Sequence, residues 1–235
     1  MTTFDPYPSA LASCRRCPRL AAHREAVAAR KRRAYLDDTY WGAPVPGFGD
    51  PAARIVLVGL APGAHGSNRT GRMFTGDASG DFLYGALYRA GLASAPVSRA
   101  RGDGLVLHGL WITAVARCVP PGNKPTPAEL DACRSWLAHD LDALGEPRVL
   151  LALGKIAHDG VLKHYRARAR AHGLALTLAR HPFAHGALHR LEALRGAPTI
   201  LDAYHPSFQN TNTGRLTAAM FDQVLATAKR LVGPP

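Results

Sequence analysis

The stretch GLAPGAHGSNRTGRMFTGDASG, residues 59–80, directly follows the short apolar run RIVLV at residues 54–58. This run is rich in β-branched residues and predicts a buried parallel strand. A strand-to-helix turn ordinarily needs only a few residues, whereas this connection is long and glycine-rich, which lets its backbone approach a ligand closely. It contains one aromatic residue, one carboxylate and two arginines: Phe74, Asp77, Arg69 and Arg72. We therefore predict a site that holds a flat ring beside a negatively charged group.

The length and composition are typical of a soluble globular protein that folds as a single domain over residues 1–235. Hydrophobic residues make up 47% and charged residues 20% of the 235-residue chain, as in ordinary globular domains, and such a chain buries a sizeable core. No apolar run approaches the roughly 18 residues of a membrane span. The first residues lack the pattern of a secretory signal. We expect a monomeric, cytoplasmic protein with no membrane partner.

The charge balance is strongly basic. The chain has 29 Lys and Arg residues against 17 Asp and Glu residues, a formal net charge of +12, and its pI is near 10.1. Such an excess attracts polyanions and speeds encounter with them. We favour nucleic acid as the partner, and the alternative is a set of solvated helix faces. The arginine-rich segments are residues 15–33 and 166–180.

Strands and helices alternate along the chain, which predicts an α/β fold in which helices cover both faces of a central, mostly parallel sheet as a three-layer αβα sandwich. A capping box at Thr126, with proline in the first helical position, marks one helix start. Strands are expected at residues 54–58, 107–116, 148–153, 174–178 and 198–204. Helices are expected at residues 8–33, 81–90, 126–144 and 216–232, and after Gly154.

Ligands of such a sheet bind at the carboxyl ends of its strands. This rule gathers the 59–80 loop, the segment after Ala116 and the segment after Tyr204 around one cleft. Pro206 favours an extended conformation for His205, which leaves this imidazole at a strand end in either a functional or a structural role. The polar run that follows is suited to enter a nucleic-acid groove, and the alternative is an ordinary surface loop.

The four cysteines form a second pattern. Cys14 and Cys17 are a C-x2-C pair, whereas Cys118 follows a predicted strand and Cys133 lies in a predicted helix. Because a cytosolic protein rarely keeps structural disulfides, a metal site is the better interpretation. Four thiolates suit structural zinc or a [4Fe–4S] cluster, and unligated thiols remain a third alternative.

Three histidines, His181, His185 and His189, have the spacing of a metal-binding helix face. Pro182 and Gly186 interrupt any regular helix there. We therefore expect these histidines to have a structural role in a loop or in the core.

Several motifs together resemble those of the uracil-DNA glycosylase superfamily. They are GLAPG at 59–63, GRMFTGDASG at 71–80, CVPPGNKP at 118–125, and His-Pro-Ser at 205–207 with Asn210, Gly214 and Arg215. Family 4 of that superfamily has Glu at the position of Leu60 and Asn at the position of Ala114. The apolar residues found here resemble family 5, the B-type iron–sulfur enzymes. Phe208 stands where that motif commonly has proline.

The resemblance implies a cofactor, a [4Fe–4S] cluster on the four cysteines, which would tie the N-terminal helix to the 118–133 segment. It also implies an activity, the hydrolytic removal of uracil and other deaminated bases, such as hypoxanthine, from single- or double-stranded DNA. The implied ligands of the cluster are Cys14, Cys17, Cys118 and Cys133. The implied catalytic residues are Asp77, His205 and Asn123, with helix capping as the alternative for Asp77.

Further residues are expected to contact the base or the DNA backbone. Those expected at the base are Gly59, Ala61, Gly63, Phe74 and Ala114. Those expected on the DNA are Arg69, Arg72, Ser207, Gln209, Asn210 and Arg215. Because Leu60 and Ala114 offer no polar reader of the base, we expect a permissive pocket. The competing hypothesis is a non-catalytic, metal-stapled DNA-binding module.

Overall fold

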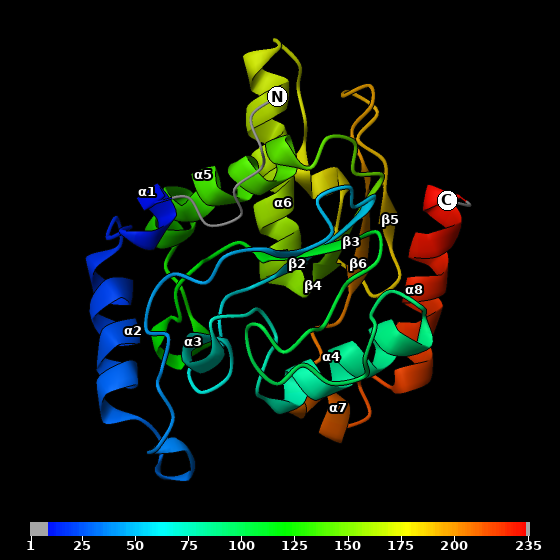
Figure 1. The fold of residues 1–235 in the computed structure, drawn as a ribbon. Coiled ribbons are helices and arrows are strands. Elements are labelled where there is room, and N and C mark those ends of the chain that lie inside the picture. Colours follow the sequence, from blue (N-terminus) through cyan, green and yellow to red (C-terminus); the bar gives the residue numbers. More distant parts are fainter. Residues whose placement is uncertain (1–8, 234–235) are drawn as a thin grey trace.

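A six-stranded sheet forms the centre of the computed structural model, which describes residues 9–233 (Figure 1). The strand order is β1-β3-β2-β4-β6-β5. The four inner strands run parallel, and the two short edge strands are antiparallel to their neighbours. The strands are β1 (Phe48–Gly49), β2 (Ile55–Gly59), β3 (Leu110–Ala114), β4 (Val149–Leu153), β5 (Leu188–His189) and β6 (Thr199–Ala203).

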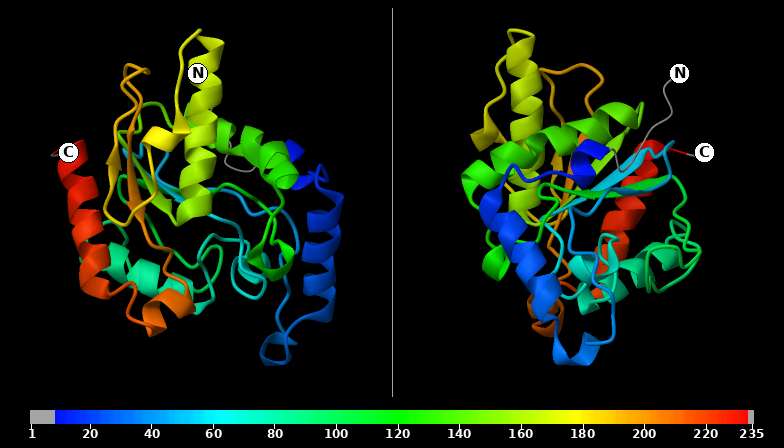
Figure 2. Two further views of the ribbon diagram at one scale, coloured as in Figure 1. Left: turned by 180° about the vertical axis from the view of Figure 1, so that it is seen from behind. Right: turned by 60° about the vertical axis from the view of Figure 1, so that its left-hand side comes forward.

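Helices cover both faces of this sheet, which confirms the predicted three-layer αβα architecture. Helices α5 (Pro127–Ala143) and α6 (Lys155–Ala171) pack on one face, and α4 (Ala78–Arg89) and α8 (Ala218–Val232) pack on the other (Figures 1 and 2). The remaining elements are α1 (Ser9–Ala12), α2 (Pro18–Arg30), α3 (Ser67–Thr70), α7 (Phe208–Asn212) and the 3-10 turns η1 (Arg33–Tyr35), η2 (Pro121–Asn123) and η3 (Leu178–Arg180). None of the helices within residues 9–233 is long and apolar enough to cross a membrane.

The apolar run of β2 is continuous because both of its faces are buried. Ile55 and Leu57 belong to the core under α4 and α8. Val56 and Val58 belong to the core under α5 and α6. Alternate side chains of a strand point to opposite faces, so one five-residue strand serves both cores.

Local signals place the helix starts, and two predictions of helix bounds need correction. The capping box at Thr126 is formed and starts α5 as predicted. Helix α4 begins at Ala78, three residues earlier than predicted, because Asp77 caps it. The predicted helix over 8–33 is broken into α1 and α2, since Pro18 starts a new helix after an irregular link, while residue 8 itself lies outside the described residues.

The prediction of a strand at residues 174–178 is wrong. This segment is irregular and leads into η3, and β5 takes the place beside β6. The three histidines lie on no common helix: His189 is buried and its Nε2 lies 2.9 Å from Oδ2 of Asp202 on β6. His158 of α6 lies 2.8 Å from the other oxygen of the same carboxylate. A buried polar cluster thus holds the irregular segment against α6 and β6.

Candidate active site

A cleft of about 750 Å³ opens at the carboxyl ends of the parallel strands. Its walls come from the 60–79 connection after β2, from η2, from the turn after β6, and from the segment around η1. The sequence predicted the first three of these segments at this edge of the sheet. Predicted residues that line the cleft are Ala61, Gly63, Phe74, Asp77, Asn123, His205, Ser207 and Gln209.

Asp77 lies at the amino end of α4 and uses its two carboxylate oxygens differently. Oδ1 accepts the backbone N–H of Gly80 at 3.0 Å, which caps the helix. Oδ2 lies against the backbone of Gly63 and Gly66, where an added Cβ would come within 2.8 Å of Oδ2 at Gly63 and would overlap it at Gly66. The capping alternative is therefore correct for Oδ1, while Oδ2 lies against two glycines that line the cleft.

Burial raises the pKa of the Asp77 carboxyl above its ordinary value, and the backbone N–H groups of Gly80 and Ser79 oppose this shift in part. A carboxylate that is held in a poorly solvated position is a stronger base than an exposed one. The residue can therefore accept a proton from a water molecule in the cleft.

Phe74 is the aromatic residue of the cleft, and its backbone is strained, with φ at +54°. Such a φ is unusual for a bulky residue, and two glycines make room for it. A Cβ on Gly59 would lie 2.9 Å from Cζ of Phe74, and a Cβ on Gly80 would overlap the Phe74 carbonyl oxygen. Strain of this kind persists where surrounding structure enforces it, often at functional sites.

His205 follows β6 and lies beside Phe74, with ring centroids 5.8 Å apart. The turn is fixed from behind, because Nδ2 of Asn210 donates to the His205 carbonyl at 2.8 Å and Ser207 caps α7. Burial lowers the pKa of His205 to about 4. The imidazole is therefore neutral at pH 7 and presents a single N–H donor.

Asn123 lies in η2, opposite the 59–80 connection, with a left-handed φ of +57°. It is exposed and lines the cleft. Ala114 does not line the cleft: it is buried at the end of β3, in register with Gly59. Its small side chain instead packs in the same core cluster as Phe74, so any influence on the base would pass through that ring.

The arginines predicted on DNA differ in their surroundings. Arg69 has a side chain 14% exposed, pairs with Asp38 at 2.6 Å and lies over the ring of Tyr35. Its guanidinium also donates to the carbonyl of Gly76 at 3.1 Å. It is therefore a staple of the 59–80 connection. Arg215 is exposed and stacks on Tyr204, at the rim near His205.

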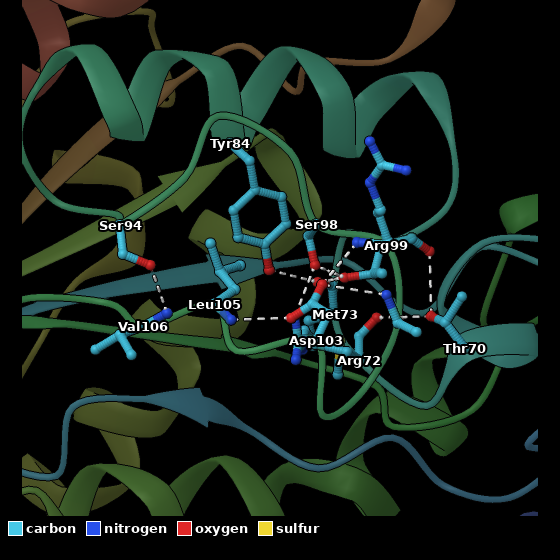
Figure 3. A network of polar contacts seen from close by, with 12 residues as sticks. Thr70, Arg72, Met73, Tyr84, Ser94, Ser98, Arg99, Asp103, Leu105 and Val106 are labelled. Atoms are coloured by element: carbon cyan, nitrogen blue, oxygen red, sulfur yellow. Dashed lines mark hydrogen bonds and ion pairs between the residues drawn. The ribbon is translucent and has the colours of Figure 1, made fainter.

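Arg72 is not among the residues that line the cleft, which the sequence prediction did not foresee. Its side chain is 4% exposed, and Nη1 lies 2.7 Å from the Asp103 carboxylate and 2.9 Å from Ser98 Oγ. Asp103 in turn accepts backbone N–H groups of its own loop, as Figure 3 shows. This network joins the segment around Arg72 to the loop around Asp103, so Arg72 has a structural role.

The cleft also has lining residues that the site prediction missed. Arg32, Tyr35 and His65 form part of its wall. Arg32 was noted only as one member of a basic segment, and His65 is in the 59–80 stretch itself. The basic run before residue 34 indicated that Arg32 could contact an anion. That this run lies beside the 59–80 connection depends on the tertiary structure, which the sequence does not show.

The four cysteines lie around one small cavity of about 20 Å³. Cys14 follows α1, Cys17 directly precedes α2, Cys118 follows β3 and Cys133 lies on α5. The spacing prediction, that these distant thiols come together, is confirmed. The cysteines are therefore the residues that could hold a metal centre.

Two buried arginines face these sulfurs. Nη1 of Arg24 lies 2.9 Å from Sγ of Cys118, and the backbone N–H of Arg117 donates to Sγ of Cys133 at 3.3 Å. Burial raises the pKa of the Cys133 thiol to about 12, so an anionic sulfur here needs a strong positive partner. Arg24 also lines this cavity, and its positive charge would favour a group held by thiolates there.

Together, these features define an α/β protein with a cleft at the strand ends that is lined by an aromatic ring, a neutral imidazole and a poorly solvated carboxylate. The family model of the Uracil DNA glycosylase superfamily matches residues 46–229. The chain belongs to this superfamily, and within it to the type-5 branch.

Proteins similar in sequence match nearly the whole of this chain. A type-5 uracil-DNA glycosylase of Thermus thermophilus is 54% identical over 97% of this chain and 98% of that protein. One from Mycobacterium leprae is 49% identical over 94% of this chain and 92% of its own length. One from Pyrobaculum aerophilum is 43% identical over 96% and 92%, respectively.

The position of Arg72 makes a first prediction. Arg72→Gln should lower the free energy of unfolding by about 1–3 kcal/mol, because it removes the charged hydrogen-bond donor of the Asp103 carboxylate. It should leave affinity for an oligonucleotide unchanged. Urea unfolding and fluorescence anisotropy measure the two quantities. The exposed comparison, Arg215→Gln, should show the opposite pattern, and weakened DNA binding with unchanged stability in Arg72→Gln would contradict the assignment.

Proposed function

We propose that this protein is a monofunctional DNA glycosylase that hydrolyses the N-glycosidic bond of uracil in DNA, as in base excision repair. The observation that carries the proposal is the convergence of Asp77 and the Phe74–His205 pair in one cleft at the strand ends. The family relationship supports it, because relatives that are 54% and 49% identical to this chain are named type-5 uracil-DNA glycosylases. The basic chain suits a DNA partner.

The proposed reaction starts with a base outside the duplex stack. A stacked base cannot be reached, so the nucleotide is flipped into the cleft or bound from a single strand. Phe74 offers a face for the ring, a contact worth roughly 1–3 kcal/mol and tolerant of base identity. Serine and amide groups of the turn after β6, with the Arg215 cation, face the neighbouring DNA backbone. The residues proposed for this contact are Ser207, Gln209, Asn210 and Arg215.

Bond cleavage needs a nucleophile at the sugar and a stabilised leaving group. Oδ2 of Asp77 takes a proton from water, the water oxygen bonds to C1′, and the C1′–N bond breaks with its electron pair passing to the base. The neutral N–H of His205 stabilises the negative charge on uracil O2, an oxyanion-type role. Asn123 completes the wall as a donor or acceptor for the water or the base. None of the described residues that line the cleft is a lysine, which argues against a Schiff-base step.

The proposed pocket is permissive. A pocket built to hydrogen-bond one base rejects others strongly, because its polar groups would be left unpaired. Here Leu60 lines the cleft and Ala114 is buried behind Phe74, so neither adds a polar reader. We therefore propose that hypoxanthine and other deaminated bases are excised as well as uracil.

We further propose a [4Fe–4S] cluster at the four cysteines. Among the described residues, the one trio of metal-ligating atoms within 4.8 Å of one another is the His158, His189 and Asp202 set, so no three cysteine sulfurs lie that close. A single tetrahedral zinc with bonds of about 2.3 Å would bring its sulfurs within about 4 Å. The wider spacing and the Arg24 guanidinium suit a larger, anionic cluster.

When bound, this cluster supplies an architectural link and no chemistry at the base. Cys118 and Cys133 flank η2, which carries Asn123, while Cys14 and Cys17 precede α2. A salt bridge between Arg19 of α2 and Glu129 of α5, at 2.6 Å, joins the same two segments. The residues of the cysteine site thus fix α2 and η2 relative to each other.

The activity is tested by incubating the protein with single-stranded and duplex oligonucleotides that carry one uracil or one hypoxanthine. Alkali then cleaves any abasic site. We expect strand breaks with both bases and none with an undamaged oligonucleotide. DNA binding without breaks on any substrate would favour the non-catalytic module. Breaks at uracil alone would retain the enzyme and remove the permissive pocket.

The role of Asp77 is tested by Asp77→Asn. Asparagine is also a good N-cap, so the free energy of unfolding should hardly change, while kcat should fall about 10²–10⁴-fold as the base is lost. Single-turnover excision and oligonucleotide affinity are measured side by side. Asp81→Asn, in the exposed first turn of the same helix, is the charge-matched control. An unchanged excision rate in Asp77→Asn would remove Asp77 from the mechanism.

The same carboxylate sets the pH dependence. Asp77 is active when deprotonated, and its raised pKa means that kcat falls on acidification at a higher pH than for an ordinary aspartate. His205, with its pKa lowered to about 4, stays neutral across that range. The fall of kcat on acidification should therefore be absent from the residual activity of Asp77→Asn and present in Asp81→Asn.

The cluster is tested by iron and labile-sulfide analysis of anaerobically purified protein. We expect about four of each per chain, and Cys133→Ser should lose them together with thermal stability. The Ser135→Ala variant on the same helix is the control and should keep the full iron content. Stoichiometric zinc without iron would refute the cluster.

A further inference from the structure

One wall of the cleft contains a histidine that the proposed chemistry does not use. His65 lies in the 59–80 connection and lines the cleft together with Arg32 and Tyr35. Behind it stands Tyr40, which is buried. These residues come from two segments, the stretch after α2 and the connection after β2.

Two hydrogen bonds link this histidine to the segment after α2. The backbone N–H of Arg32 donates to the hydroxyl oxygen of Tyr40 at 3.3 Å. The Tyr40 hydroxyl lies 3.0 Å from Nδ1 of His65. The hydroxyl accepts the Arg32 N–H, and we assign its own proton to the contact with Nδ1, since this arrangement gives the hydroxyl both an acceptor and a donor role. Nδ1 then acts as the acceptor, and the ring proton is on Nε2.

The imidazole is kept neutral. Burial, with the charges of Arg32 and Arg69, lowers the pKa of His65. Within residues 9–233, Nε2 meets no protein acceptor and is not among the buried unpaired atoms. A neutral N–H donor with no protein partner is therefore presented in a wall of the cleft.

The position of this donor relative to Asp77 is fixed by the backbone. Gly66, the next residue, packs against Oδ2 of Asp77. Arg69 donates from Nε to the His65 carbonyl at 2.7 Å and from Nη2 to the Gly76 carbonyl. The Arg69 guanidinium thus joins the residue before Asp77 to His65.

We propose that Nε2–H of His65 binds a backbone phosphate next to the flipped nucleotide, and that Tyr40 is its positioning residue. This inference rests on the proposed function. A flipped nucleotide offers base carbonyls and phosphate oxygens as acceptors. The base is assigned to the Phe74–His205 pair, whereas His65 shares its wall with the Arg32 cation, whose charge favours the phosphate.

Steady-state excision of uracil from a single-stranded oligonucleotide tests the proposal. His65→Leu should raise KM roughly tenfold, as expected for one lost hydrogen bond to a charged group, with little change in kcat. His65→Gln, which keeps an amide N–H near the position of Nε2, should restore most of the loss. Tyr40→Phe, which keeps the ring but not the donor to Nδ1, should raise KM less. His108→Leu, on an exposed loop, is the control.

Salt dependence separates the two members of the wall. A neutral donor displaces no counterion, so His65→Leu should weaken binding to an abasic-site oligonucleotide without changing the slope of log K against log salt. Arg32→Gln should reduce that slope by about one. A phosphate at Nε2 should also raise the pKa of His65 in the complex, which NMR titration of the imidazole measures.

The outcomes separate this inference from the proposed function. If the wild-type protein excises uracil while His65→Leu keeps its KM, or while the His65 pKa is the same with and without DNA, the inference is overturned. If the wild-type protein excises no base, the proposed function fails, and the slope and NMR measurements on the bound oligonucleotide still decide whether His65 meets a phosphate. Recovery of most of the lost KM in His65→Gln, together with a raised pKa of His65 in the complex of the wild-type protein, supports the proposal.

Discussion

The candidate site depends on one close approach of backbone to side chain at the ends of the parallel strands. Phe74 and Asp77 occupy this space only because Gly59, Gly63 and Gly66 have no Cβ there. The glycines therefore do not make the connection loose. They let a large ring and a carboxylate lie against the backbone, and the arginine and hydrogen-bond staples around them keep both in place.

Two further constraints build the rest of the cleft around this centre. The turn after β6 is held by the Asn210 amide on the His205 carbonyl, which places a neutral imidazole beside Phe74. The segment carrying Asn123 is bounded by Cys118 and Cys133 and anchored through the buried Arg117–Asp140 pair between β3 and α5. Separate contacts therefore hold these two walls of the cleft in place.

Much of the fold could be predicted because its signals are local. The apolar run of β2 predicts a strand and the capping box at Thr126 predicts a helix start, each from only a few residues. Both predictions are confirmed. The predicted strand at 174–178 failed because a short apolar run forms a strand only where a sheet edge is free, and β5 occupies that edge. The gathering of the four cysteines was predictable from residue type, since a metal site is a common role for separated thiols that form no disulfide.

The site itself was predictable in its centre and not in its wall. Asp77 and Phe74 are in one motif, so the sequence places them together. Arg72 is in the same motif, yet its partner Asp103 is 31 residues away, and a pairing of that kind decides whether an arginine is free for DNA. His65 is likewise assigned a role only through Tyr40, 25 residues away.

The most direct test of this account is the rate of uracil excision by Gly66→Ala, measured with the thermal melting temperature of the same preparation. The added Cβ would overlap Oδ2 of Asp77. The Gly66 backbone, at φ −96° and ψ −102°, also lies outside the regions that alanine prefers, so the melting temperature reports how much of any lost activity is lost stability. The account predicts a folded protein that has lost most of its excision rate. Excision at the wild-type rate by Gly66→Ala would contradict it, because the glycine-lined approach would then not position the base.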